Sequence, residues 1–576
     1  MTEPNLTAIT LFCAVFYLIS KLKTRLTLSK AKYRSLSGHA KWSRIIAKQI
    51  PYFDYPISDF FRIDNAPEKI ETKRREAFHK LAKAISFYDE NFDDNSQQTS
   101  LSSISDINFT NAYRVPYPFR RLVQSKFKLN NYVLETKGVK IKDKQGDWYF
   151  DLSGSYGVNL FGYDFYKKCL SNGLQKMNAI GPILGLYHPL IESNVKKLKA
   201  ISNLDEVSFH MSGTEAVMQA VRLARYHTGR SHLVRFCGAY HGWWDGVQPG
   251  IGNQRKTNDV YTLAELSEKT LEVLKTRKDI ACILINPLQA FHPNLDAPSD
   301  ASLINSSRST NFNREEYTQW LSSLREICTQ RGIVMIMDEI FTGFRLGYKG
   351  AQEFFKVQAD MVTYGKTLGG GMPVGVVCGK KELMKRFKDS QPVNVSFARG
   401  TFNSHPLLMT SMNEFLLAIE TPKIQKQYET SESDWVERVN RLNQSLEQAN
   451  VPVKIKHIFS ILTVNFTVPS AYNWMFQFYL RQEKLMLSWI GSGRFIMSHN
   501  YDDKLFQEVI IRIVDAAVKM KDDGWWHQSN NVTNKSISKN MLRMIVLNRF
   551  PWTKKIIKPN LSLRPKEVKN SHDQSQ

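Results

Sequence analysis

The chain carries MIMDEIFTGFRLGYKGAQEFFKVQADMVTYGKTLGGGM at Met335 to Met372, and the rest of the sequence is best interpreted from there. This stretch begins inside a short apolar run, Ile333 to Met337, whose β-branched bias predicts a buried parallel strand. Asp338 follows at the carboxyl end of that strand. A second, weaker apolar run ends at Lys366, which precedes the glycine triplet Gly369 to Gly371. The sequence therefore predicts a carboxylate and a lysine at the ends of two strands.

These two side chains are suited to holding a cofactor, because a lysine amine forms a Schiff base and a carboxylate keeps a pyridine nitrogen protonated. The segments DEIFTGFR, GAQ and YGKTLGGGMPVG, in this order and spacing, resemble class III (fold type I) pyridoxal-phosphate aminotransferases. Within that class the glutamate-1-semialdehyde aminomutase-like subgroup is the most similar. The resemblance implies that Lys366 forms the Schiff base with pyridoxal 5'-phosphate and that Asp338 is the pyridinium partner.

The resemblance covers roughly residues 113 to 525 and implies an α/β architecture. It predicts a large domain with a mostly parallel sheet flanked by helices, plus a smaller α+β domain built from both ends of the catalytic region. We predict six segments. They are an apolar and basic N-terminal segment (1–30), an extension with a polar linker (31–110), the first part of the small domain with the active-site entrance (111–190), the large cofactor-binding domain (191–420), the C-terminal small domain (421–526) and a basic tail (527–576).

A predicted anion site lies upstream, in VSFHMSGTEAVMQAVRLARYHTGR at Val207 to Arg230. A short strand ends at Ser212, Gly213 and Thr214, and a helix then begins with apolar residues at helical spacing. Backbone N–H groups at a helix start are unpaired and attract anions. SGTEA resembles the phosphate cup of the class III family, which implies that these three residues hold the cofactor phosphate.

Two further segments extend the resemblance. FCGAYHG places Tyr240 where the family has an aromatic ring against the pyridine, with a catalytic and a cofactor-binding role; the role of His241 stays open. RGTFNSHP resembles a loop whose threonine, here Thr401, reaches the cofactor phosphate of the neighbouring subunit. This implies a homodimer with a shared active site.

The segment ACILINPLQAFHPN at Ala281 to Asn294 departs from the family. Asn286 replaces the usual glutamate, and Phe291 stands where the aminomutases typically carry asparagine. The segment also resembles a form seen in aminotransferase domains of hybrid polyketide–peptide synthetases. We expect cofactor binding to survive these changes and the reaction to be altered.

The distribution of charge along the chain indicates which kind of binding partner to expect. The formal net charge is +24, and residues 1–50 and 527–576 each contribute +8, so the remaining 476 residues also carry only +8. Basic ends on a nearly balanced body suit an anionic membrane surface better than nucleic acid, which we do not expect as a partner.

The six cysteines are scattered without CxxC spacing, which favours a reducing, cytoplasmic location and argues against a metal site.

Near the N-terminus, Leu6 to Ser20 is uncharged and mostly apolar and is followed by Lys21, Lys23 and Arg25. A spanning helix needs ~20 apolar residues, so this stretch is short. A membrane anchor and a helix docked on the protein's own surface both remain open.

Several local predictions can be compared with the structure. They are helices at Glu68–Tyr88, Arg314–Arg331 and Trp435–Ala449, a linker at Asn91–Asn108, a β-meander at Val133–Gly157, a strand at Ile458–Phe466, a helix start opened by Ser498, and a surface- or membrane-contacting or solvated segment at Met541–Trp552.

We therefore predict an aminotransferase that moves an amino group from a small-molecule amino donor to a carbonyl acceptor, either free or bound to a carrier protein. An intramolecular aminomutase of the glutamate-1-semialdehyde type is the alternative within the same class of enzyme. A non-catalytic, membrane-tethered protein on the same fold is the alternative from another class.

Overall fold

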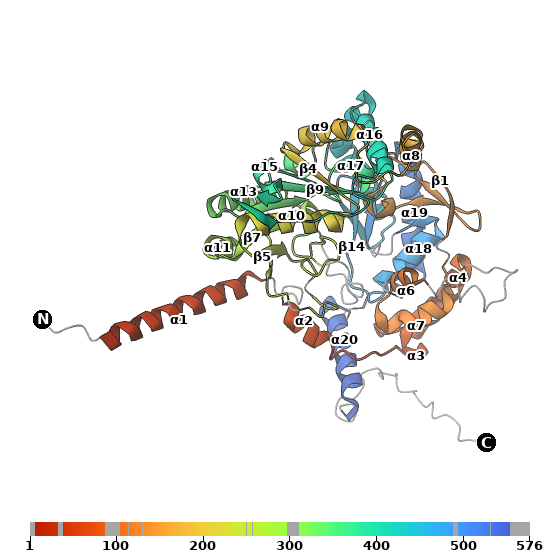
Figure 1. Cartoon of the computed structure of the whole chain (residues 1–576). Helices are drawn as coiled ribbons and strands as arrows, with labels where there is room; N and C mark the ends of the chain where they lie inside the picture. Colours follow the sequence, from red (N-terminus) through yellow and green to blue (C-terminus); the bar gives the residue numbers. More distant parts are fainter. Residues whose placement is uncertain are drawn as a thin grey trace, which may run out of the picture.

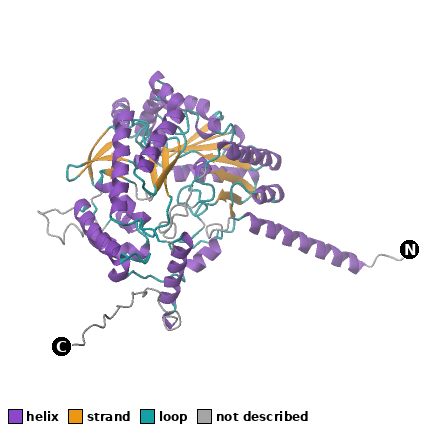
Figure 2. Ribbon diagram, turned by 180° about the vertical axis from the view of Figure 1, so that it is seen from behind, coloured by secondary structure: helices purple, strands orange, loops and turns teal. Residues whose placement is uncertain are grey.

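The computed structural model shows a body of strands enclosed by helices, from which one long helix, α1 (Leu6–Ala31), projects (Figures 1 and 2). It describes residues 6–32, 39–86, 104–112, 114–129, 132–248, 250–255, 257–295, 310, 312–487, 493–529 and 532–552.

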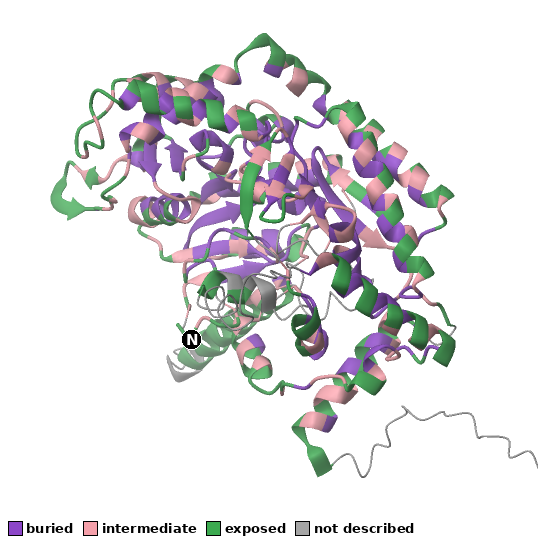
Figure 3. Ribbon diagram, turned by 90° about the vertical axis from the view of Figure 1, so that its right-hand side faces the viewer, coloured by how far each residue is buried: buried purple, intermediate pink, exposed green. Residues whose placement is uncertain are grey.

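A seven-stranded sheet with the order β4-β10-β9-β8-β7-β5-β6 forms the centre of the body. β10 runs antiparallel to both of its neighbours, and the other neighbouring pairs are parallel. Figure 3 shows the strands as the buried interior of the molecule. The bounds are β4 Glu206–His210, β5 His232–Phe236, β6 Val260–Leu263, β7 Ile280–Ile285, β8 Val334–Asp338, β9 Met361–Gly365 and β10 Gly375–Gly379.

Helices cover both faces of this sheet, which is why its central strands β7, β8 and β9 are buried at every position. Alternate residues of β8 join different clusters: Met335 and Met337 pack in the largest core cluster, whereas Val334 and Ile336 pack with helix α10. The covering helices include α8 Tyr163–Met177, α9 Leu190–Ser202, α10 Gly213–Thr228, α11 Glu268–Thr276, α13 Arg314–Arg331 and α16 Pro406–Ala418. The predicted mostly parallel sheet flanked by helices is confirmed.

Two smaller sheets form the second unit. The predicted meander is present as three antiparallel strands, and Phe150 of its last strand pairs with Leu485 of β15. Segments that precede and follow the strands of the large sheet in the sequence thus share one smaller sheet, as predicted. The bounds are β1 Val133–Lys137, β2 Lys140–Asp143, β3 Trp148–Asp151 and β15 Leu485–Met486 in one sheet, and β13 Val453–Ile458, β14 Ile461–Phe466 and β16 Arg494–Ile496 in the other.

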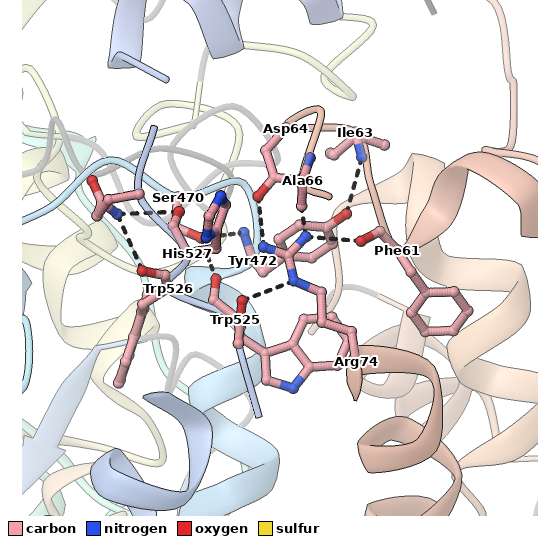
Figure 4. Close-up of polar contacts among 12 residues, drawn as sticks. Phe61, Ile63, Asp64, Ala66, Arg74, Ser470, Tyr472, Trp525, Trp526 and His527 are labelled. Carbon is pink, nitrogen blue, oxygen red and sulfur yellow. Dashed lines mark hydrogen bonds and ion pairs between the residues drawn. The ribbon is translucent and has the colours of Figure 1, made fainter. Parts of the chain in front are cut away.

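The N-terminal extension is part of this second unit. Helix α4 (Glu68–Ile85) packs one face on α18 (Phe476–Gln482) and exposes the other, which confirms the helix predicted at Glu68. The guanidinium of Arg74, which is fully buried, lies 2.6 Å from a carboxylate oxygen of Asp64. It also donates to the carbonyl of Phe61 at 2.8 Å (Figure 4) and to the carbonyl of Gly524 at 2.9 Å. Arg74, held by its ion pair with Asp64 inside the extension, therefore ties the extension to the C-terminal part of the chain through its hydrogen bond to Gly524.

The C-terminal region contains a helix that was not predicted. Helix α20 (Asn534–Arg549) buries Ile537 and Met541 in the core cluster of the second unit. Arg549 donates to the side chain of Gln49 at 2.9 Å. This part of the basic tail is therefore docked on the body.

Three local predictions differ from the structure. The stretch Ile458–Phe466 is not one strand: a turn at Phe459, in the left-handed conformation at φ 47°, separates β13 from β14. Ser498 does not begin a helix, because Asp502 caps α19 (Asp503–Asp522) and accepts the N–H of Leu505. The helix expected from Trp435 begins much earlier, since α17 spans Pro422–Gln448.

The predicted linker overlaps α6 (Ser105–Ala112), while its residues 91–103 lie outside the described residues. Helix α1 is longer than the apolar stretch that begins it and remains attached to the body at its C-terminal end, where Ala31 accepts the N–H of Ala264 at 2.9 Å. Within the described ranges, none of the helices has the length and apolar character needed to cross a membrane.

Candidate active site

The predicted site residues gather along one edge of the large sheet. Asp338 is the last residue of β8, and Lys366 directly follows β9. Asn286 directly follows β7, His241 lies in the loop after β5, and Ser212 lies just beyond β4. These five strands are mutually parallel, so their carboxyl ends meet at the edge where open α/β sheets bind ligands.

The carboxylate of Asp338 is buried and held on both oxygens. One oxygen accepts from the Thr363 hydroxyl at 3.1 Å and from the Ile340 N–H at 3.2 Å. The other lies 2.7 Å from Nδ1 of His241. Asp338 and Thr363 are register partners on β8 and β9, so the sheet itself sets the first of these contacts. The carboxylate is therefore fixed in orientation.

His241 is the residue whose role the sequence left open. Its side chain is fully buried, and with Nδ1 on Asp338 its other ring nitrogen, Nε2, has no hydrogen-bond partner in the described part of the chain. The only signal for it in the sequence is its place next to Tyr240. The structure brings its imidazole against the carboxylate predicted to face a cofactor.

Lys366 is held in a strained and apolar setting. Its backbone has φ 50°, in the left-handed region, which costs of order 1–3 kcal/mol for a residue other than glycine. Its ammonium lies 5.6 Å from the centre of the Phe341 ring. Burial lowers the pKa of Lys366 to about 8, with Asp338 opposing and Arg345 adding to that decrease. The neutral, nucleophilic fraction of this amine near neutral pH is therefore far larger than that of a lysine with the ordinary pKa of 10.5.

Ser212, Gly213 and Thr214 form the start of helix α10. The Ser212 hydroxyl caps the helix by accepting the N–H of Glu215 at 3.2 Å. The N–H groups of Gly213 and Thr214 lie in the first turn, where an α-helix offers no internal carbonyl partner, so they are available to an anion. A Cβ on Gly213 would lie 2.7 Å from Ile340, two residues beyond Asp338. The predicted cup therefore packs directly against the β8 end of the site.

Tyr240 and Asn286 are neighbours. The Asn286 side chain donates to the Tyr240 carbonyl at 3.0 Å and accepts the Leu288 N–H at 3.1 Å. Tyr240 is 63% exposed, and partial desolvation of its hydroxyl, followed by the charge of Asp338, raises the pKa of that hydroxyl. Asn286 thus holds the Tyr240 backbone with a neutral amide that donates and accepts at once. Phe291, in contrast, is buried in the main core cluster.

Thr401 is not brought to the other predicted site residues by a hydrogen bond in the described chain. It lies in an exposed turn between β12 (Gln391–Val395) and α16, and its neighbours Phe397 and Phe402 are also exposed. This position agrees with a residue that acts outside its own subunit.

The site has the features that pyridoxal 5'-phosphate needs. It offers an amine with a lowered pKa, a buried carboxylate for the pyridine nitrogen and a helix start for the phosphate. Gly242, at φ 92°, approaches Thr214 so closely that a Cβ would lie 2.5 Å from its hydroxyl. Glycine at this point keeps the cup open. We conclude that the residues present fit the cofactor.

Fold comparison shows that this chain shares its fold with solved transaminase structures. A transaminase with PLP bound matches with a TM-score of 0.60, covering 75% of this chain and 100% of that one at 22% identity. A glutamate-1-semialdehyde aminomutase from Pseudomonas aeruginosa PAO1 also gives 0.60, covering 78% and 98% at 15% identity.

The family model for class-III aminotransferases matches residues 124–516. Because this is more than half of the chain, the protein belongs to the class-III aminotransferase family, and the predicted cofactor and enzyme class are confirmed. Glutamate-1-semialdehyde 2,1-aminomutase of Methanococcus maripaludis strain C5 is 31% identical over 355 residues, 58% of this chain and 76% of its own. The protein of that name from Geotalea daltonii is 30% identical over 366 residues, 60% and 78% respectively.

Proposed function

We propose that Lys366 and Asp338 carry out the chemistry of a pyridoxal-phosphate-dependent aminotransferase. When bound, pyridoxal 5'-phosphate supplies an electron sink for negative charge at the amino-bearing carbon of the substrate. The Lys366 Nζ would hold the cofactor through its aldehyde. As a free amine, the same Nζ would act as the general base that takes the proton from the amino-bearing carbon of the substrate.

The other side chains position the reacting groups. Asp338, oriented by His241 and Thr363, keeps the pyridine nitrogen protonated. Ser212, Gly213 and Thr214 bind the phosphate, and Tyr240 lies against the ring. These roles are supported by the common sheet edge and the held carboxylate.

The observation that carries this proposal is the half-buried lysine of lowered pKa beside an oriented buried carboxylate. Its direct test is the visible absorbance of the purified protein saturated with pyridoxal 5'-phosphate. We expect a band from lysine-bound cofactor in the wild type and none in Lys366→Ala, which still binds the cofactor without the covalent bond. Lys356→Ala, at another left-handed lysine on the surface, is the matched control and should keep the band. A wild type without the band would refute the proposal.

We infer that the amino group goes to a separate carbonyl acceptor. The neutral Asn286, which replaces a glutamate of the aminomutases and is bonded to the Tyr240 backbone, favours this reaction over the intramolecular one. The names of the relatives favour the aminomutase. Half-reaction spectroscopy against a panel of amines and amino acids separates them: conversion of the cofactor by an external donor, with turnover dependent on that donor, supports transfer. Turnover of glutamate-1-semialdehyde alone would establish the aminomutase.

We further propose a homodimer in which Thr401 acts on the cofactor phosphate of the partner subunit. Its exposed position, flanked by the apolar side chains of Phe397 and Phe402, supports this arrangement. Co-expression of Lys366→Ala and Thr401→Ala chains provides the test. If Thr401 acts across subunits, the mixed dimer holds one intact site and regains the wild-type cofactor affinity there. If Thr401 acts within its own subunit, or the protein is a monomer, no site recovers.

The N-terminal helix suggests contact with a membrane surface. Its described N-terminal half exposes large apolar side chains and is followed by basic residues (Leu11, Phe12, Phe16, Leu18, Ile19, Lys21, Lys23 and Arg25). We expect flotation with vesicles of phosphatidylglycerol but not of phosphatidylcholine, and loss of flotation in Phe12→Asp/Phe16→Asp. Equal behaviour of variant and wild type would exclude this role for α1.

A further inference from the structure

Helices from the two ends of the chain meet at the lower side of the body in Figure 1 and form what we call the α2–α20 surface. Helix α2 spans Ala40–Ala47 and helix α20 spans Asn534–Arg549. Arg549 at the end of α20 donates to the side chain of Gln49, just after α2, at 2.9 Å. Both helices lie outside residues 124–516, the part that matches the class-III family. The proposed chemistry therefore leaves this surface without a role.

Helix α2 is amphipathic, and its apolar face is the one turned to solvent. Its three largest apolar side chains follow helical spacing on one face, and all of them are exposed (Trp42, Ile45 and Ile46). The other face is on the body, where Ser43 is buried and Arg44 donates to two carbonyls of the loop 253–255 at 2.9 and 3.1 Å. A surface helix normally buries its apolar stripe and exposes its charges. Polar contacts therefore hold α2 with its apolar face outward.

Helix α20 adds a stripe that mixes apolar and basic side chains. One face is anchored, because Ile537 and Met541 are buried in the core cluster of the second unit. The exposed stripe follows helical spacing on another face (Lys535, Lys539, Leu542, Val546 and Arg549). Just beyond the helix, Phe550 and Trp552 are exposed as well. Aliphatic, aromatic and cationic groups are therefore presented together.

The charge of the α2–α20 surface has one sign. Residues 39–53 contain three Lys or Arg and residues 527–552 contain four, and neither stretch contains Asp or Glu. Nucleic acid would neutralise these charges and leave the aliphatic side chains in water. An anionic lipid surface satisfies both kinds of group, because headgroups pair with the cations and the layer beneath takes up apolar side chains. Tryptophan is also enriched at the level of the headgroups.

We propose that the α2–α20 surface docks on an anionic lipid bilayer. Its aliphatic side chains and the rings of Trp42 and Trp552 enter the boundary between headgroups and acyl chains, and its lysines bind the headgroups. This contact is separate from the one proposed for α1 and does not depend on the aminotransferase reaction. A single weak membrane anchor gives marginal attachment, and stable attachment takes two. In this protein α1 and the α2–α20 surface supply the two.

Hydrogen exchange of the full-length protein, saturated with pyridoxal 5'-phosphate, shows where a membrane contacts it. Exchange is followed without lipid, with vesicles of phosphatidylcholine, and with vesicles of equal parts phosphatidylcholine and phosphatidylglycerol. We expect the anionic vesicles to slow exchange at residues 40–50 and 542–552, and the neutral vesicles to leave it unchanged. Unchanged exchange at either segment with the anionic vesicles would overturn the proposal.

Substitutions on the exposed faces test the apolar groups. The variants are Trp42→Gln/Ile45→Gln on α2 and Leu542→Gln/Val546→Gln on α20, with Ile511→Gln on α19 as the control at a similarly exposed position. Glutamine is a good helix former and the replaced side chains are exposed, so the Tm should not fall. Each pair should weaken binding to the anionic vesicles by about tenfold or more, and the control should bind as the wild type does. Pairs that bind as tightly as the control would contradict the proposal.

The basic groups are tested by Lys535→Gln/Lys539→Gln. This variant should weaken binding to the anionic vesicles by about tenfold or more, with the difference from the wild type shrinking as salt is added. If the variants on α2 and α20 shift the oligomeric state and leave vesicle affinity unchanged, the surface joins copies of the chain and the proposal is overturned.

Phe12→Asp/Phe16→Asp separates this surface from α1. In that variant flotation should be lost, because only one weak contact remains, while exchange at residues 40–50 and 542–552 still slows at high concentrations of the anionic vesicles. Loss of both effects would show that α1 alone binds lipid and would overturn the proposal. Retention of both would exclude the role of α1 and leave the α2–α20 surface as the membrane contact.

Discussion

Nδ1 of His241 and a carboxylate oxygen of Asp338 lie 2.7 Å apart, and both side chains are buried. Since an ionised carboxylate can only accept, the imidazole carries its proton on Nδ1. The two residues are 97 positions apart in the chain, one in the loop after β5 and one at the end of β8. This pair fixes the carboxylate that we propose holds the pyridine nitrogen protonated.

Replacement of Asp338 by asparagine should lower kcat by on the order of 10²–10³, because it removes the charge that stabilises the protonated pyridine nitrogen. Single-turnover kinetics with a working donor would measure the chemical step. His241→Asn should give a smaller loss, since the carboxylate keeps its contacts with Thr363 and Ile340. A loss in His241→Asn as large as in Asp338→Asn would contradict a positioning role.

Capture of pyridoxal 5'-phosphate by the apoprotein should become faster with rising pH, with a midpoint near pH 8. Burial lowers the pKa of Lys366 to about 8, so the neutral, nucleophilic fraction grows from pH 7 to pH 9. Stopped-flow absorbance would follow the reaction. Asp338→Asn should move the midpoint to lower pH, because the Asp338 charge raises this pKa. A rate that is flat over this range would contradict the buried amine.

The same pKa shift predicts how stability depends on pH. The folded pKa of Lys366 lies below its ordinary value of 10.5, so the unfolded chain binds more protons between pH 8 and pH 10.5. The free energy of unfolding of the apoprotein should therefore rise with pH in that window, relative to Lys366→Met. Urea unfolding of both proteins at several pH values would measure this. A constant difference between them would be inconsistent with a buried lysine.

Gly213→Ala should weaken the binding of pyridoxal 5'-phosphate, because a Cβ there lies 2.7 Å from Ile340 and shifts the helix start. We expect a loss of about tenfold or more, corresponding to one perturbed hydrogen bond to a charged group. Gly250→Ala is the matched control, since no atom lies within 4 Å of its added Cβ. Equilibrium dialysis of the cofactor would compare them, and equal affinities would argue against a phosphate cup.

Arg74→Met should destabilise the protein by ~3–5 kcal/mol, because Asp64 would remain buried without its partner. Arg75→Met removes a partly exposed ion pair with Glu71 and should cost less than about 1 kcal/mol. Urea unfolding would measure both. The double variant Arg74→Met/Asp64→Asn should recover part of the loss. Equal effects of Arg74→Met and Arg75→Met would show that the extension is not held by this contact.

Much of the site could be predicted from local sequence, because the pattern of a strand or helix identifies the residues at its own end or start. The apolar run at Ile333–Met337 has the pattern of a doubly covered strand, so Asp338 had to lie at a sheet edge. Lys366 and Ser212 were found in the same way. The long-range pairs could not be predicted, since the contact of His241 with Asp338 depends on which strands become neighbours in the sheet.

The sequence by itself determined the family, the lysine that we propose holds the cofactor and the helix start, because each depends on a short run of residues and its order along the chain. Only the tertiary structure decided that His241 holds Asp338, that Asn286 holds the Tyr240 backbone and that Arg74 anchors the extension. The physical reason is that burial and pairing over long sequence separations arise from packing, and no local pattern encodes them.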